Sequence, residues 1–230
     1  ALEVLRRLSN FATKHNLCSG IRFVIEMPKV NNLMTENLTP EEYNRLENLL
    51  DEEKDIQAAN LLRFALFTGM RRGELFKLKW KDINFNTKII LIRDPKSGLD
   101  ETIPINEIAL SVLDKHPKTE SEFVFPGLGG NQRKTTPRPL RRVIKKAGLN
   151  NFRPFHGLRH AYASTLASSG KVDLYKLQKL LTHKSPLMTQ RYAHLSNDAL
   201  MEASNVISDL TKSHQNITDL DELKIGKGES

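Results

Sequence analysis

One short segment, residues 156–160, combines side chains that bind anions and move protons. It reads His-Gly-Leu-Arg-His, so His156 and Arg159 stand three residues apart and share one face if the segment is helical. On that face the two side chains could address two atoms of one bound group. A metal site is disfavoured, because His-x-x-x-His here lacks the glutamate of a metalloprotease helix and has no carboxylate or cysteine nearby.

Two further candidate residues follow downstream. His183 stands in Leu-Leu-Thr-His-Lys-Ser-Pro at 180–186, and Tyr192 comes nine residues after it. A tyrosine hydroxyl acts as a nucleophile when a neighbouring group takes its proton. A tyrosine in a polar, basic helix is often only a half-exposed core residue, and we interpret Tyr175 in that way.

A second arginine lies in a turn earlier in the chain. Residues 68–75 read Thr-Gly-Met-Arg-Arg-Gly-Glu-Leu and place Arg71 between two helical segments, within a stretch bounded by glycines. From there its guanidinium could point at an anion beside a helix N-terminus. The alternative is a surface ion pair between Arg71 and Glu74.

The elements that must position these residues are mainly helices. Apolar residues at helical spacing predict a helix over 2–16. Thr39, Pro40 and Glu42 supply a cap, a first-turn proline and an acid at the third helical position, so a second helix should begin at Pro40. Residues 58–68 continue as a strongly apolar helix that Gly69 ends.

A small sheet should accompany the helices. Residues 88–92 and 101–105 are typical of short strands, joined by a turn at 95–98. The fold class predicted is therefore α+β, mainly helical with a small sheet. The single cysteine, Cys18, can form no internal disulfide; we expect a buried apolar thiol, in keeping with a reducing cytosol.

Basic residues are concentrated in one part of the chain. Lys and Arg number 35 against 27 Asp and Glu, a formal net charge of +8. Between Glu122 and Asp198 the only acid is Asp173, whereas the basic residues are Arg133, Lys134, Arg138, Arg141, Arg142, Lys145, Lys146, Arg153, Arg159, Lys171, Lys176, Lys179, Lys184 and Arg191. Exclusion of acids over such a length indicates a surface that faces phosphates. Nucleic acid is the expected partner, ahead of an acidic membrane surface or a merely solvated basic face.

Membrane insertion and secretion are not expected. No stretch approaches the roughly 18 apolar residues of a membrane span, and charges occupy the first residues, where a signal peptide needs an apolar core. The chain opens on alanine, so we expect a fragment of a longer protein.

Taken together, these motifs resemble those of the tyrosine recombinases, the family of phage-type integrases and Xer-like recombinases. Their catalytic domain is marked by an arginine after Thr-Gly-(Leu/Met), a lysine in a β-hairpin, a His-x-x-Arg pair, a second histidine or tryptophan, and a tyrosine about nine residues later. This sequence fills every position in the family's order, with Arg71, Lys96, His156, Arg159, His183 and Tyr192. It departs from the pattern at Thr182, where relatives commonly have glycine.

The resemblance implies a DNA strand-exchange reaction. Tyr192 would attack a phosphate to give a 3′-phosphotyrosine and a free 5′-hydroxyl, with Arg71 and Arg159 on the two non-bridging oxygens. His156 would be the base or positioning group, and His183 would donate to a phosphoryl oxygen. Lys96 would protonate the leaving oxygen. No metal ion or other cofactor would be needed.

Neighbouring residues would support this set. We expect Glu74 to steady Arg71, His160 to be a structural hydrogen-bonding residue, and His194 to be a surface residue. Phosphate contacts, and one base contact, are expected from a turn and helix start that hold the basic residues Arg133, Lys134, Arg138, Arg141 and Arg142.

The resemblance also implies a domain organisation and an assembly. Residues 1–36 would be the end of an N-terminal DNA-clamping domain and a linker, 37–207 the tyrosine recombinase catalytic domain with a small antiparallel sheet, and 208–230 a polar tail. An apolar stripe over 197–207 would dock onto a neighbouring protomer or onto its own domain. The implied partner is double-stranded DNA at attachment sites, on which the protein would form a homotetramer, whereas in isolation it would be a monomer. Accessory DNA-bending or directionality proteins would be further partners. The implied location is the cytoplasm, in association with the nucleoid.

Three functions remain open at this point. The first is a site-specific recombinase that integrates or excises a phage or genomic island. The second is a non-catalytic DNA-binding protein on the same fold, against which the full catalytic set argues. The third is a type IB topoisomerase or telomere resolvase, which the short spacing between His156 and Tyr192 makes less fitting.

Overall fold

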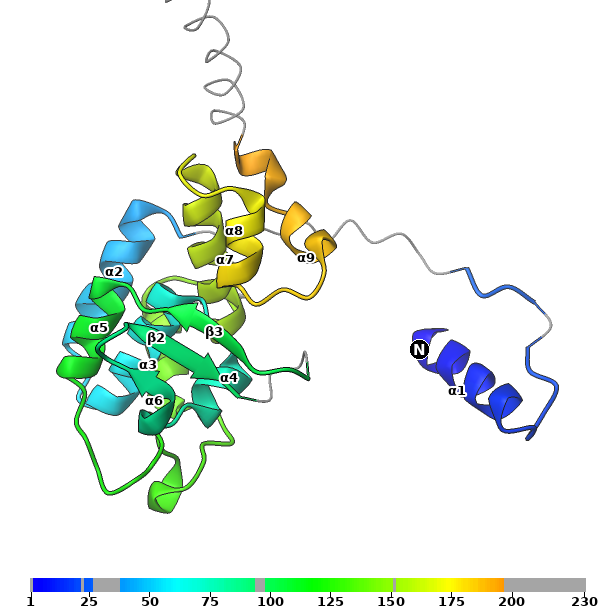
Figure 1. Cartoon of the computed structure of the whole chain (residues 1–230), viewed down its shortest axis with the longest axis horizontal. Helices are drawn as coiled ribbons and strands as arrows, with labels where there is room; N and C mark the ends of the chain where they lie inside the picture. Colours follow the sequence, from blue (N-terminus) through cyan, green and yellow to red (C-terminus); the bar gives the residue numbers. More distant parts are fainter. Residues whose placement is uncertain (1, 22, 27–37, 94–97, 151, 197–230) are drawn as a thin grey trace, which may run out of the picture. The chain divides into compact units, whose positions relative to one another are not determined.

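The computed structural model describes residues 2–21, 23–26, 38–93, 98–150 and 152–196, and the chain divides into two compact units, Ala1–Met34 and Thr35–Ser230. The described residues of the first unit hold one helix, α1 (Leu2–Lys14) (Figure 1). No residue of α1 is buried. Cys18 follows it and is exposed. The prediction of a buried thiol is wrong, because this small unit has too few apolar neighbours to cover it.

The second unit is mainly helical, as predicted. Its helix α2 begins at Pro40 behind a capping box, in which Thr39 Oγ1 accepts from the Glu42 N–H and Glu42 Oε2 accepts from the Thr39 N–H. The helices in chain order are α2 (Pro40–Asp51), α3 (Ile56–Thr68), α4 (Arg72–Lys77), α5 (Glu107–Asp114), α6 (Arg138–Lys146), α7 (Pro154–Ser168), α8 (Leu174–Leu180) and α9 (Pro186–Gln190). Short 3₁₀ turns lie at Trp80–Asp82, Leu128–Gly130 and Ala193–Ser196.

The sheet has three antiparallel strands in the order β1 (Ile83–Asn84), β2 (Ile89–Ile92) and β3 (Glu101–Pro104). Ile90 pairs with Ile83 on one side and Ile103 on the other, and all three are buried. The antiparallel pair was predicted, whereas the two-residue β1 is too short to leave a period in the sequence. The predicted turn at 95–98 lies mostly outside the described residues.

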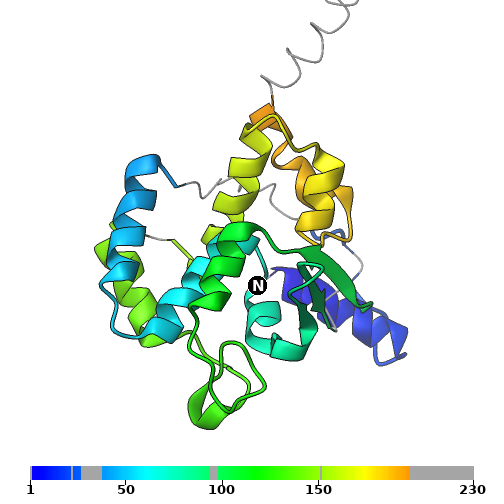
Figure 2. The same cartoon turned by 60° about the vertical axis from the view of Figure 1, so that its left-hand side comes forward.

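The main core is built around α3. Nine residues of this helix are buried, and it packs against α5, α6 and α7 (Figure 2). Aromatic pairs extend the core, with Phe64 and Phe125 at 5.6 Å between ring centroids and Phe76 edge-on to Phe155 at 5.4 Å. α3 and α7 therefore form the centre of this core; Arg159 lies within α7, and Arg71 follows the end of α3.

A second, smaller core joins α7 to α8 and to the segment that follows α9, and these three helices lie together in both views (Figures 1 and 2). It contains Leu177, Leu181 and Tyr192, with Leu174 packed against it. Tyr175 is 68 % exposed, so our interpretation of it as a half-buried core residue is wrong. One residue past Leu174 on α8, it lies away from the buried stripe, and the ammonium of Lys179 lies 5.5 Å from its ring centre.

Candidate active site

Arg71 is placed by a sharp stop between two helices. α3 ends at Gly69, whose left-handed backbone (φ 62°) turns the chain, and Arg71 then caps the N-terminus of α4. Glu74 holds it twice: its Oε2 accepts from the Arg71 backbone N–H at 2.8 Å, and its Oε1 from Nη1 at 2.7 Å. Glu74 is buried, so this is not the surface ion pair of the alternative interpretation, and the expectation that Glu74 steadies Arg71 fits the geometry.

Arg71 also crosses to the turn between α8 and α9. Its Nη1 donates to Thr182 Oγ1 at 2.5 Å, and its Nη2 donates to the Thr182 carbonyl at 2.8 Å. Among the described residues its guanidinium thus makes three hydrogen bonds, which leaves two of its five N–H groups for an anion.

Arg159, on α7, connects the turn after α3 with the turn between α8 and α9. Its Nη1 donates to the Gly69 carbonyl at 2.8 Å, and its Nη2 donates to the Leu181 carbonyl. The side chain is buried, and burial, followed by the positive charge of Arg71, lowers the pKa of Arg159 to about 10. It remains protonated at neutral pH, so two guanidinium groups close enough to repel each other form a strongly positive site.

His183 follows Thr182 in the turn between α8 and α9 and is half-buried. Its Nδ1 is 2.8 Å from the hydroxyl of Thr189, which is buried. Burial and then the charges of Arg159 and Arg71 lower the pKa of His183 to about 3, so the ring is neutral at physiological pH. When the Thr189 hydroxyl donates to Nδ1, the proton of His183 sits on Nε2, where it can be donated to an anion.

Tyr192 is buried, with 2 % of the residue exposed, and its hydroxyl oxygen lies 2.7 Å from Nδ1 of His160. The opposite nitrogen of His160, Nε2, lies 3.0 Å from Nε2 of His156. His156 is exposed, one helical turn before His160 on α7. Burial and then the charge of Arg191 lower the pKa of His160 to about 4.

Five of the six sequence-predicted residues are therefore positioned by neighbouring contacts, and the sixth, Lys96, lies outside the described residues. Sequence reasoning missed two partners. Thr182 was regarded only as a departure from the family pattern, although it supplies two acceptors to Arg71. His160 was assigned a structural role, although it is the histidine that contacts Tyr192; its spacing of four residues from His156 on a helix was the available signal.

The candidate DNA-binding residues lie around α6. Lys134, Arg138, Arg141 and Arg142 are exposed, and Arg142 pairs with Glu53 at 2.9 Å. Arg133 differs, because it is half-buried and its guanidinium donates to the carbonyls of Phe125 and Pro126, with its pKa lowered by burial.

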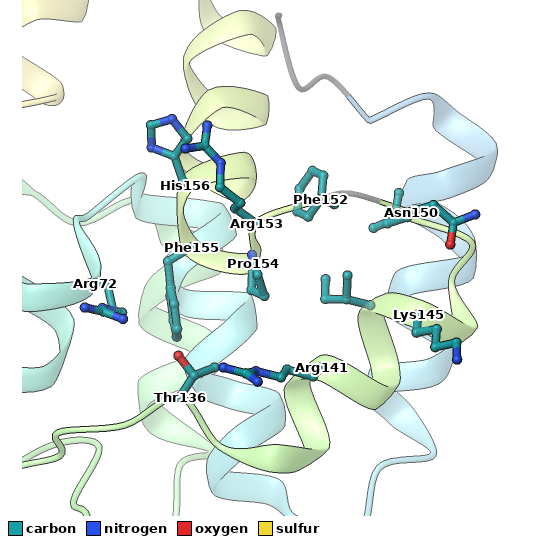
Figure 3. A pocket seen from close by; sticks show the side chains of 12 residues that line it. Arg72, Thr136, Arg141, Lys145, Asn150, Phe152, Arg153, Pro154, Phe155 and His156 are labelled. Carbon is teal, nitrogen blue, oxygen red and sulfur yellow. The ribbon is translucent and has the colours of Figure 1, made fainter. Parts of the chain in front are cut away.

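A pocket of about 630 Å³ lies between α6 and the start of α7, with Arg72 of α4 also on its wall. Figure 3 shows Arg72, Arg141 and Lys145 around it, together with Arg153 and His156 from α7 and the segment before it. The exposed His156 and four basic side chains therefore line the same pocket, an arrangement suited to phosphate groups.

The described residues offer neither a metal-binding cluster nor a membrane-spanning helix. They contain no group of three or more His, Cys, Asp or Glu side chains arranged to hold a metal ion. No helix among them combines the length and apolar character needed to cross a membrane.

Comparison with known proteins confirms the resemblance. Residues 36–198 match the model of the phage integrase family, so the chain belongs to this family and contains a tyrosine recombinase catalytic domain. Tyrosine recombinase XerA of Pyrococcus horikoshii is 31 % identical over 186 residues, covering 78 % of this chain and 64 % of the relative. The integrase of Salmonella phage P22 is 30 % identical over 202 residues, covering 81 % and 51 %.

A solved structure agrees on the fold. The Tn1549 transposon integrase in complex with circular intermediate DNA superposes with a TM-score of 0.69 at 19 % identity, covering 88 % of this chain and 76 % of that one. The present chain spans about half to two thirds of the length of the two curated relatives.

Proposed function

We propose that this protein is a site-specific recombinase that cuts and rejoins DNA through a 3′-phosphotyrosine at Tyr192. The observation that carries the proposal is the convergence of two hydrogen-bonded guanidinium groups, a neutral His183 and a buried tyrosine hydroxyl on the elements around α7. A tetrahedral phosphodiester gains negative charge in the transition state, and preorganised cationic donors stabilise that charge.

Each side chain has one task in this scheme. Arg71 and Arg159 bind the non-bridging oxygens, and Thr182, Leu181 and Gly69 fix their orientation. His183 donates from Nε2 to a phosphoryl oxygen. Tyr192 attacks phosphorus, and the energy of the broken phosphodiester is kept in the new P–O bond, so a second strand can be joined without ATP.

Lys96 is proposed as the general acid that protonates the leaving 5′-oxygen. With two guanidinium groups balancing the charge of the phosphate, the reaction needs no divalent ion. Lys134, Arg138, Arg141 and Arg142 are proposed to contact DNA phosphates, whereas the internal bonds of Arg133 suit it to shaping the loop rather than to a leading phosphate contact.

The proposed biological role is integration or excision of a phage or genomic island. Its support is the match to a phage integrase and the structural likeness to a transposon integrase in complex with DNA. The assembly proposed is a homotetramer on two DNA sites, with accessory DNA-bending or directionality proteins as further partners.

A nicked suicide substrate tests the proposal. The substrate is a duplex made from the junction sequence that flanks the gene, nicked so that the cleaved fragment diffuses away and the covalent intermediate accumulates. We expect an SDS-resistant protein–DNA band with the wild type and none with Tyr192→Phe. Tyr175→Phe is the matched control, because it removes the same hydroxyl from an exposed tyrosine and should leave the band unchanged.

Two outcomes would contradict the proposal. DNA binding by the wild type without any covalent band would favour the non-catalytic alternative, and a band with Tyr192→Phe would exclude Tyr192 as the nucleophile. Activity that disappears with EDTA and returns with magnesium would show that the metal-independent scheme is wrong.

A further inference from the structure

His160 connects the buried nucleophile to a histidine at the surface. Its Nδ1 lies 2.7 Å from the Tyr192 hydroxyl oxygen and its Nε2 lies 3.0 Å from Nε2 of His156. Only 3 % of His160 is exposed, whereas His156 is exposed and lines the basic pocket beside α6. Each contact has the length of a hydrogen bond, so the three side chains form one continuous chain.

We propose that His160 is a proton-relay residue, which takes the phenolic proton of Tyr192 and passes a proton on to His156. The inference rests on the proposed function, because it requires Tyr192 to be the nucleophile. It changes the assignment of His156, which then acts on the phenol through His160 rather than by direct contact.

The relay conserves protons at every atom. Tyr192 gives its hydroxyl proton to Nδ1 of His160 while His160 gives its Nε2 proton to Nε2 of His156. The phenolate oxygen forms a bond to phosphorus as the bond from phosphorus to the 5′-oxygen breaks. His156 becomes an imidazolium and, because it is exposed, releases a proton to water; the 5′-oxygen takes its proton from a separate acid, for which Lys96 is proposed.

The charges around His160 favour a relay over storage of the proton on this ring. Arg153, His156 and Arg159 face it from α7 and the residue before it, and His183 and Arg191 face it from the segments on either side of α9. Burial, followed by the charges of Arg191, His156, Arg153 and Arg159, lowers the pKa of His160 to about 4, so the ring stays neutral while one proton replaces another.

Arg191 also stabilises the product of the transfer. Its Nη1 lies 3.4 Å from Nε2 of His160 and can donate to that nitrogen once the nitrogen has lost its proton. After the proton transfer, Nδ1–H of His160 donates to the phenolate oxygen of Tyr192. Both ends of the His160 ring are then satisfied while negative charge is present on Tyr192.

Replacement of His160 by asparagine separates the two contacts. The amide of His160→Asn can occupy the place of Nδ1 and hold the Tyr192 hydroxyl, but it has no atom at the place of Nε2. The measurement is the single-turnover rate of covalent adduct formation from pH 6 to 9, with a substrate whose bridging 5′-oxygen is sulfur. A thiolate leaves without a proton, so the rate reports activation of the nucleophile and not the general acid.

The pH profile distinguishes a relay from a structural role. We expect His160→Asn to react roughly 100-fold more slowly at pH 7 and to recover about tenfold per pH unit as hydroxide replaces the relay. His194→Asn makes the same change at an exposed histidine and should react like the wild type. A rate within threefold of the wild type throughout, or one lowered equally at every pH, would overturn the relay.

Failure of the proposed function looks different. A wild type that binds DNA without forming an adduct, or a Tyr192→Phe variant that forms one, would overturn the recombinase mechanism and the relay with it. If His160→Asn does not fold, the ¹⁵N signals of the histidine rings decide the question in the wild type and in Tyr192→Phe. We expect loss of the phenol to shift the signals of both His160 and His156; an unchanged His156 would overturn the coupling.

Discussion

A single threonine holds Arg71, one of the two arginines proposed to bind phosphate, in place. Thr182 is β-branched, yet its backbone has φ 49°, a left-handed conformation that costs such a residue about 1–2 kcal/mol. In return its hydroxyl and its carbonyl both accept from Arg71. A glycine at this position would adopt the same backbone without strain, but would offer the carbonyl alone. The backbone strain at Thr182 is therefore offset by two hydrogen bonds from Arg71.

The hydroxyl of Thr182 should accordingly matter for cleavage. Thr182→Val keeps the shape but removes the acceptor for Nη1 of Arg71, and a lost hydrogen bond to a charged group costs about 1.5 kcal/mol or more. We expect adduct formation to slow roughly tenfold, measured in single turnover. Thr182→Ser is the matched control, since it keeps the hydroxyl; equal rates for the two variants would show that the contact does not position Arg71.

The sequence shows the candidate site residues and their order, but not the contacts that they make. The sequence alone shows the order of the candidate residues, because each stands in a short motif; they are Arg71, His156, Arg159, His183 and Tyr192. The contact between His160 and Tyr192 is not visible in the sequence, because the two residues are 32 positions apart and meet only when the segment after α9 packs on α7. Burial of Tyr192 itself was likewise invisible from its polar neighbours.

At the scale of elements, the end of α3 sets the geometry of both arginines. Gly69 supplies the left-handed residue that ends the helix, its carbonyl accepts from Arg159, and the turn it makes leads to Arg71. The ring of Tyr162 lies against it, so that a Cβ built on Gly69 would come within 2.4 Å of Tyr162 Cδ1. Glycine is thus required here by both backbone and space.

Gly69→Ala should therefore destabilise the fold and disturb the site together. The left-handed backbone costs an alanine about 1 kcal/mol, and displacement of the Tyr162 ring adds about 1–3 kcal/mol. We expect the free energy of unfolding to fall by about 2 kcal/mol or more in urea denaturation. Gly73→Ala, in α4 with open space around the new methyl group, should instead stabilise by about 0.5–1 kcal/mol. Equal effects at the two glycines would contradict this account of the turn.

The elements most fully predicted were those with local signals. The helix start at Pro40 and the stop at Gly69 depend on caps whose partners lie within four residues. The strand β1 was missed, since two residues carry no alternation and their pairing with β2 comes from the turn between them. Exposure of Tyr175 was missed because a tyrosine next to leucines does not reveal which side of the helix is buried.

At the scale of the whole molecule, positive charge and the site coincide along the chain. The stretch between Glu122 and Asp198 contains one acid and fourteen basic residues, and it includes His156, Arg159, His183 and Tyr192. Acidic side chains gather instead on α2 and the segment that follows it, where Arg63 is held by Glu47 and Asp51. The net charge of +8 is therefore the sum of two unlike surfaces.

This distribution predicts how DNA binding responds to salt. Each phosphate neutralised by a basic side chain releases counterions, so the logarithm of the association constant should fall linearly with the logarithm of salt concentration, with a slope of about −0.9 per contact. Replacing both Arg138 and Arg141 by alanine should make that slope shallower by up to about 1.8, as measured by fluorescence anisotropy with duplex DNA. The control is the double alanine variant of Lys54 and Lys115, two exposed lysines outside the basic stretch, which removes the same amount of positive charge. If binding depended on net charge alone, both variants would change the slope equally. If a local surface on α6 binds the phosphates, only the arginine variant will.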